Sequence, residues 1–231
     1  MCHQDCINFA KKNFRVEEIK NKSVIEVGSA NHNGSVREFI EFLDPYRYIG
    51  VDIQDVSGVD VVCNAENLVD YFGQESFDVL ISTEMLEHVR NWQDVVSNFK
   101  KVLKPNGILL ITTRSIGFPY HSAPFDFWRY QIEDMKFIFS DLLIEVLEKD
   151  PEQPGVFIKA KKTPDFVENN LAEYPLYSIV KHSRIATLTD DDISEFDQWI
   201  NKMDLFVRRT IIKLLPSSLR KFIKKRILKL I

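Results

Sequence analysis

Residues 23–35 read SVIEVGSANHNGS, and this stretch decides the fold of the chain. Its β-branched beginning ends in a glycine, which predicts a short buried strand over 23–28. Residues 35–43, SVREFIEFL, place apolar side chains at helical spacing and predict a helix. A strand that leads through a glycine-bearing loop into a helix is the first unit of an α/β sheet.

The alternation of strands and helices continues beyond this unit. Further strands are predicted at YIGVDI (48–53), GVDVVC (58–63), FDVLIST (77–83) and GILLITT (107–113). Each run is apolar enough for burial on both faces, as strands of a parallel sheet are. A helix is predicted over 92–103, with one apolar stripe and with Asn91 and Asp94 as its cap and capping partner.

The pattern changes after residue 141. The segments LLIEVLEKD, PEQPG and VFIKAKK follow one another and leave no room for a crossover helix. Two strands joined by a short turn pair antiparallel. The predicted fold class is therefore α/β, with a doubly wound, mostly parallel, seven-stranded sheet closed by a C-terminal antiparallel hairpin.

The chain is predicted to divide after residue 162 into a ligand-binding domain, 1–162, and a helical extension, 163–231. Residues 163–188 are interpreted as a loop or partly helical excursion. A helix is predicted over 190–215, started by Thr189 and an acidic run. Pro216 ends it, and a last basic amphipathic helix follows.

The net charge of −4 conceals an asymmetry. Residues 208–231 hold nine Lys or Arg and no acid, which leaves 21 basic against 34 acidic residues, or −13, for 1–207. A body this acidic is a poor nucleic-acid binder. The tail over 217–231 fits either an anionic membrane surface or docking on this chain's own body or on a second subunit.

The chain has neither a long apolar run nor a basic-then-apolar start, and it holds three cysteines. Spanning of a membrane and secretion are therefore not expected, and the thiols are expected to be reduced. The expected location is the cytoplasm, with peripheral contact at the inner membrane face if the tail binds lipid. The number of subunits is left open.

Three residues of this pattern suit a ligand with a ribose and a charged amino-acid end. Gly28 lets the backbone turn close to a ligand, and Gly34 opens the helix whose amides face it. Asp52 ends the second strand, where its carboxylate can accept from both ribose hydroxyls. A nicotinamide dinucleotide site is the alternative, but the G-x-G-x-x-G spacing is not met because Ala30 follows Gly28.

Over residues 23–162 the chain resembles the class I S-adenosylmethionine-dependent methyltransferases. The matching segments are Glu26-Val27-Gly28 with Gly34, Gly50-Val51-Asp52, Asn64-Ala65-Glu66, Phe77-Asp78-Val79-Leu80 through Glu87-His88-Val89, and Leu103-Lys104-Pro105-Asn106-Gly107. The resemblance implies S-adenosylmethionine as cofactor and methyl transfer as activity. The implied cofactor-binding residues are Glu26, Gly28, Ser29, Asp52, Asn64, Ala65 and Thr83.

The resemblance also implies a role for several of these side chains. Glu26 would order the first loop and the methionine amino group, Asp52 would hold the ribose, and Asn64 and Ala65 would meet the adenine. The chain departs from the family pattern in its loop, where Ala30 replaces a second glycine and three residues lengthen the connection.

Candidate acceptor-site residues come from the loop over 115–131, in which six aromatic side chains surround His121, Asp126 and Arg129. His121 suits a general base by its intrinsic pKa. Glu84, at the end of the fourth strand, is a fourth catalytic candidate. The alternative interpretation is a small aromatic core in which Arg129 pairs with Asp126 and His121 is only hydrogen bonded.

Cys2, His3 and Cys6 are residue types that bind zinc. Three such groups within five residues, without a second pair elsewhere, do not predict a metal site, and none is expected. The function predicted is methyl transfer from S-adenosylmethionine to an oxygen, with nitrogen as second choice, of a small molecule or sugar. The alternative is a catalytically silent module that recruits a membrane or glycan-assembly partner.

Overall fold

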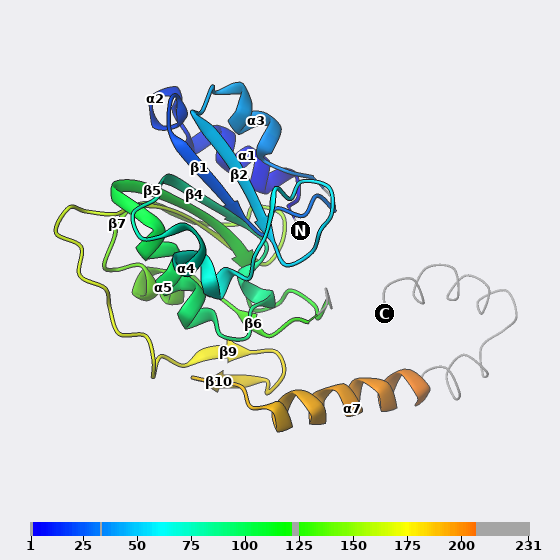
Figure 1. The fold of residues 1–231 in the computed structure, drawn as a ribbon. Helices are drawn as coiled ribbons and strands as arrows, with labels where there is room; N and C mark the ends of the chain where they lie inside the picture. The colour runs from blue at the N-terminus through cyan, green and yellow to red at the C-terminus, as the bar shows by residue number, and fades with distance from the viewer. Residues whose placement is uncertain (1, 33, 122–124, 207–231) are drawn as a thin grey trace, which may run out of the picture.

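The computed structural model describes residues 2–32, 34–121 and 125–206, and its centre is a seven-stranded sheet (Figure 1). The strands are β1 (Ser23–Val27), β2 (Arg47–Asp52), β3 (Val61–Val62), β4 (Phe77–Thr83), β5 (Leu103–Arg114), β7 (Leu143–Lys149) and β8 (Gly155–Lys161). Their order is β3-β2-β1-β4-β5-β8-β7. β8 runs antiparallel to both of its neighbours, whereas β1 to β5 pair parallel. The predicted fold class, including the closing hairpin, is confirmed.

Helices cover both faces of this sheet, as Figure 1 shows. One side carries α1 (Gln4–Asn13), α2 (Val16–Ile19) and α3 (Arg37–Phe42), and the other carries α4 (Leu68–Phe72), α5 (Trp92–Val102) and α6 (Ile132–Ile138). Successive residues of β1 point to opposite faces, so Val24 packs with the α1 and α3 side and Ile25 with the α4, α5 and α6 side. Burial of both faces explains the near-continuous apolar strands of the sequence.

Two local predictions differ from the structure. The strand expected over 58–63 contains only Val61–Val62, because Gly58 adopts φ +94° in a turn before it. Asn91 stands before α5 but makes no capping hydrogen bond, since its amide donates to the Glu66 carboxylate instead, with nitrogen–oxygen distances of 3.3 and 3.4 Å. Asn91 therefore bonds to a residue distant in the sequence and does not cap its own helix.

A second, three-stranded sheet lies outside the main one. It consists of β6 (Trp128–Arg129), β9 (Leu176–Ser178) and β10 (Ser183–Ile185) in the order β10-β9-β6. Residues 163–188 are mainly loop, as expected, but the two short strands within them were not predicted. Strands this short are stable here because β6 offers β9 an edge and the side chains of Trp128 and Leu176 are fully buried.

The last described element is α7 (Asp190–Phe206). Thr189 and Asp192 form its capping box, with the Thr189 Oγ1 accepting from the Asp192 amide and the Thr189 amide donating to the Asp192 carboxylate. The predicted helix start is confirmed. The remainder of the helix predicted to 215, and the basic segment over 217–231, lie outside the described residues, and the division after 162 stays a prediction.

None of the helices that the structure describes is both long and apolar enough to cross a membrane.

Candidate active site

The carboxyl ends of β1, β2, β4 and β5 meet at one edge of the sheet, where an open parallel sheet binds ligands. At the end of β1, Gly28 adopts φ +83°, and a Cβ on it would lie 2.7 Å from the Cβ and Cγ of Met85. The amides of Gly28 and Ser29 both donate to the Val51 carbonyl. Glycine is therefore required here for its backbone angle and for the close approach of the segment after β4.

Asp52 ends β2 and faces this loop. Its Oδ2 accepts from the Ala30 amide at 3.3 Å, and its Oδ1 accepts from the Gln54 amide at 3.1 Å. Each carboxylate oxygen has a second lone pair, and the side chain is half-buried, so both oxygens can still accept from a ribose hydroxyl. Asp52 thus also holds the lengthened loop in place.

Glu26 lies deeper in β1, where its side chain is buried and accepts a hydrogen bond from the Tyr48 hydroxyl. Burial raises the pKa of Glu26 to about 7, although the Tyr48 hydrogen bond acts to lower it. A cationic ligand group nearby would favour the ionised carboxylate. Its predicted contact with a methionine amino group stays a prediction.

Asn64 and Ala65 follow β3. The Asn64 side-chain oxygen accepts from the Glu66 amide at 3.0 Å and caps the short 3₁₀ turn η1 (Ala65–Asn67). Asn64 is exposed, whereas Ala65 is buried. A surface hollow lies beside them and is lined by Val62, Cys63, Asn64, Asn67, Asp70 and Tyr71. Of the two residues expected to meet an adenine, Asn64 therefore borders this hollow, and Ala65 does not line it.

Two hydroxyl groups lie buried at this edge. Ser29 is 2% exposed, and its Oγ makes no hydrogen bond to any described residue. Thr83, at the end of β4, is also 2% exposed. A buried hydroxyl without a partner is costly unless a ligand satisfies it. The glycine turn, the Asp52 carboxylate and the unpaired Ser29 hydroxyl fit a cofactor that carries a ribose and a charged amino-acid end.

His121, Asp126 and Arg129, three of the four predicted catalytic residues, lie together. His121 Nδ1 is 3.0 Å from Asp126 Oδ2, which also accepts from the His121 amide at 2.9 Å and from Arg129 Nη2 at 2.7 Å. Burial acts to raise the pKa of Asp126, but hydrogen bonds from Arg129 and His121 outweigh it and lower the pKa to about 2. Asp126 is therefore a fixed carboxylate that orients the His121 ring.

Sequence reasoning did not assign a role to Glu87, which lies beside this dyad. Its carboxylate is fully buried and accepts from the Thr113 hydroxyl at 2.9 Å. The Nε2 atoms of His88 and His121 are 3.8 and 3.9 Å from Glu87 Oε1. In the sequence, only the position of Glu87 directly before His88, in the turn after β4, pointed to this residue.

Glu84, the fourth predicted catalytic residue, belongs to a different group. It adopts φ +54° just after β4, and its carboxylate pairs with Arg114 at the end of β5. Burial and the nearby Glu87 raise its pKa well above the ordinary value. Glu84 faces Cys6 from the N-terminal helix, so the structure separates it from the His121 dyad.

A seven-stranded sheet with one antiparallel strand, a glycine turn after β1 and an acid at the tip of β2 together define the class I S-adenosylmethionine-dependent methyltransferase domain. Residues 4–147 match the family model described as a methyltransferase domain. The chain belongs to this family, and S-adenosylmethionine is its cofactor.

Individual relatives agree with this class. The phthiotriol/phenolphthiotriol dimycocerosates methyltransferase 1 of Mycobacterium ulcerans is 30% identical over 122 residues, which cover 48% of this chain and 44% of that protein. The match thus spans less than half the length of this curated relative.

Solved structures share the fold at low sequence identity. The 1,6-didemethyltoxoflavin-N1-methyltransferase of Burkholderia thailandensis, solved with 1,6-didemethyltoxoflavin and S-adenosylhomocysteine, has a TM-score of 0.54 at 13% identity, covering 68% of this chain and 78% of that one. An S-adenosylmethionine-dependent methyltransferase of Mesorhizobium loti has a TM-score of 0.52 at 14% identity, covering 67% and 96%.

Proposed function

We propose that this enzyme methylates a hydroxyl oxygen of a small molecule or sugar, with His121 as the general base. The observation that carries the proposal is the His121–Asp126 contact, which Arg129 fixes at the carboxyl edge of the sheet. Methyl transfer to an alcohol needs removal of the hydroxyl proton, whereas an amine can attack through its own lone pair. An oriented, carboxylate-backed imidazole therefore favours oxygen over nitrogen.

The dyad assigns a role to each ring nitrogen of His121. Nδ1 lies 3.0 Å from the Asp126 carboxylate, which favours the hydrogen on Nδ1 and leaves the Nε2 lone pair to accept the acceptor's proton. Asp126 then stabilises the imidazolium that forms. S-adenosylmethionine, when bound, supplies the methyl group on a positively charged sulfur, so the oxygen gains the methyl group as Nε2 gains the proton.

Neighbouring groups support the same direction of proton transfer. Glu87 Oε1 lies 3.9 Å from His121 Nε2, so its charge stabilises a protonated ring. The Phe118 ring centroid is 5.0 Å from that of His121 and excludes water from one side. A positioned base of this kind contributes roughly 10²–10⁴-fold to the rate.

The proposed class of methyl acceptor is supported by the same site and by the name of one relative. The name of the Mycobacterium ulcerans relative specifies a phthiotriol as acceptor, which is a molecule that carries hydroxyl groups. This supports a hydroxylated acceptor, while the sugar or lipid around the hydroxyl is chosen by residues outside the dyad.

The test measures S-adenosylhomocysteine production by the full chain with panels of methyl glycosides, polyols, phenols and amino sugars. Turnover with a hydroxyl acceptor is expected, and His121→Ala should lower kcat by about 10²-fold or more without weakening cofactor binding in calorimetry. His182→Ala is the matched control, because His182 is exposed and contacts Phe196 and Trp199.

Two results would contradict the proposal. One is turnover with amino acceptors alone, and the other is a hydroxyl acceptor that His121→Ala methylates at the wild-type rate. Any acceptor-dependent production of S-adenosylhomocysteine excludes a catalytically silent module.

A further inference from the structure

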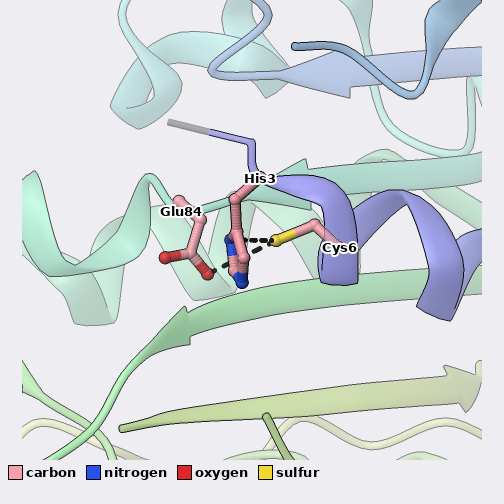
Figure 2. Close-up of side chains that lie close together, drawn as sticks. All are labelled: His3, Cys6 and Glu84. Atoms are coloured by element: carbon pink, nitrogen blue, oxygen red, sulfur yellow. Dashed lines mark hydrogen bonds between the residues drawn. The ribbon is translucent and has the colours of Figure 1, made fainter. Parts of the chain in front are cut away.

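His3, Cys6 and Glu84 converge in the interior although they lie far apart in the sequence (Figure 2). Cys6 Sγ is 3.0 Å from His3 Nδ1 and 3.8 Å from Glu84 Oε1. His3 precedes α1, Cys6 lies in its first turn, and Glu84 follows β4. Sequence reasoning considered Cys2, His3 and Cys6 together but missed the carboxylate that the fold brings to them.

These three groups offer three donor atoms that lie within 4.8 Å of one another. A thiol, an imidazole and a carboxylate are ligands that zinc takes in proteins. Cys2 is 5% exposed nearby, and its thiol contacts the His3 carbonyl at 3.8 Å. We propose that His3, Cys6 and Glu84 bind one zinc ion.

The spacing of the donor atoms suits a tetrahedral ion. With Zn–S of about 2.3 Å and Zn–N or Zn–O of about 2.0–2.1 Å, a tetrahedral angle separates sulfur from nitrogen or oxygen by about 3.5–3.6 Å. The Cys6 contacts at 3.0 and 3.8 Å lie on either side of this value. The two Cys6 distances would therefore have to change by only about half an ångström to admit the ion.

The groups behind the donors are those that a zinc site requires. His3 Nε2 lies 2.9 Å from the buried Asp150 Oδ2, so Nε2 carries the hydrogen and Nδ1 presents its lone pair to Cys6. Arg114 Nη2, which can only donate, lies 3.4 Å from the same Nδ1. A carboxylate behind a ligating histidine is the usual means of fixing its tautomer.

The second oxygen of Glu84 and the thiol of Cys6 are also held. Arg114 pairs with Glu84 through Oε2, and Glu84 Oε1 faces Cys6. The Thr112 hydroxyl donates to Cys6 Sγ at 3.2 Å.

The charges of the cluster balance when zinc is bound. The Cys6 thiolate and the Glu84 and Asp150 carboxylates contribute −3, and zinc and the buried Arg114 together contribute +3. Three protein ligands leave the fourth position of a tetrahedral ion for water. The ion would tie the start of α1 to the ends of β4 and β5, beside the cofactor edge.

The test uses the full chain purified under reducing conditions without chelator. Elemental analysis is expected to find about one zinc per chain, and cobalt substitution should give a thiolate charge-transfer band with strong four-coordinate visible bands. Cys6→Ser and Glu84→Gln should each weaken zinc binding at least about 10²-fold, and Asp150→Asn about 10–100-fold.

Matched controls separate ligand loss from general damage. Cys63→Ser removes the third thiol, and Glu75→Gln alters a glutamate with a similar φ of +52°, so both should bind zinc like the wild type. If Cys6→Ser does not fold, Glu84→Gln and the cobalt spectrum of the wild type decide. A wild-type chain that takes up neither zinc nor cobalt, or a cobalt spectrum without thiolate bands, overturns the proposal.

Discussion

The cofactor edge, formed by the ends of β1, β2 and β3, differs in construction from the acceptor edge at the ends of β4 and β5. The first uses residues 26–65, which are close in sequence, and its key acid, Asp52, is half-buried. The second gathers buried charged groups from residues 3 to 150, which pair with one another. The cofactor edge therefore depends on local backbone, and the acceptor edge depends on tertiary packing.

Removal of the Asp52 carboxylate should have the largest effect at the cofactor edge. Each hydrogen bond to a charged group contributes about 1.5–3 kcal/mol, so loss of two ribose contacts in Asp52→Ala should weaken S-adenosylhomocysteine binding about 10²–10⁴-fold in calorimetry. Asp55→Ala, three residues on and exposed, should bind normally. Equal affinities for the two variants would show that the cofactor lies elsewhere.

At the acceptor edge, loss of a buried charge partner should affect stability. Arg129→Met leaves the Asp126 carboxylate without its two guanidinium hydrogen bonds, which should cost about 3–5 kcal/mol in urea unfolding. Lys12→Met breaks the exposed pair with Glu148 and should cost no more than about 1 kcal/mol. Similar losses of stability in Arg129→Met and Lys12→Met would contradict the conclusion that the acceptor edge depends on buried charge pairs.

The pairing of Asp126 with Arg129 also predicts how the stability of the protein changes at low pH. The pKa of Asp126 is lowered from 3.8 to about 2 because hydrogen bonds from Arg129 and His121 outweigh the opposing effect of burial. Its contribution to stability should be complete above pH 3.8 and lost as the pH falls through 2.

Glu26 should give the opposite pH dependence. Its pKa is raised from 4.5 to about 7 by burial, so the folded state holds the proton more tightly than the unfolded state. Stability should therefore fall by about 2–3 kcal/mol as the pH rises from 4.5 to 7, and Glu26→Gln should remove this fall. Urea unfolding across this range measures it, with the exposed Glu38→Gln as control. An unchanged pH profile in Glu26→Gln would refute the assignment.

The last comparison concerns two glycines with nearly the same backbone angle. Gly28 has φ +83° and Gly73 has φ +81°, but only at Gly28 would a Cβ collide with a neighbour, Met85, at 2.7 Å. Gly73→Ala should cost about 1 kcal/mol from backbone strain, and Gly28→Ala about 1–3 kcal/mol more from the collision. Thermal unfolding measures both, and Met85→Ala should recover part of the difference. Equal losses would mean that the segment after β4 can move away.

Local patterns predicted the cofactor edge well because each of its parts lies within one short motif. The strand before Gly28, the acid Asp52 and the closing hairpin all appear where the sequence placed them. The small sheet of β6, β9 and β10 was missed because strands of two or three residues carry no usable periodicity. Their pairing exists only once β6 provides an edge.

The acceptor edge was predicted only in part. His121, Asp126 and Arg129 are near one another in sequence, and their association was visible. Glu84 was grouped with them because the ends of neighbouring strands meet, but the buried Arg114 draws its carboxylate toward Cys6. No sequence pattern specifies which of several charged groups will pair inside a protein.

The sequence by itself determined the sheet, the glycine turn and the acid at the tip of β2, since strand period, backbone freedom and charge are properties of single residues and their neighbours. Tertiary structure alone decided that His3 would meet Asp150 and that Glu87 would lie beside His121. These contacts join segments separated by dozens of residues, and burial forces their charges to find partners that only the folded chain supplies.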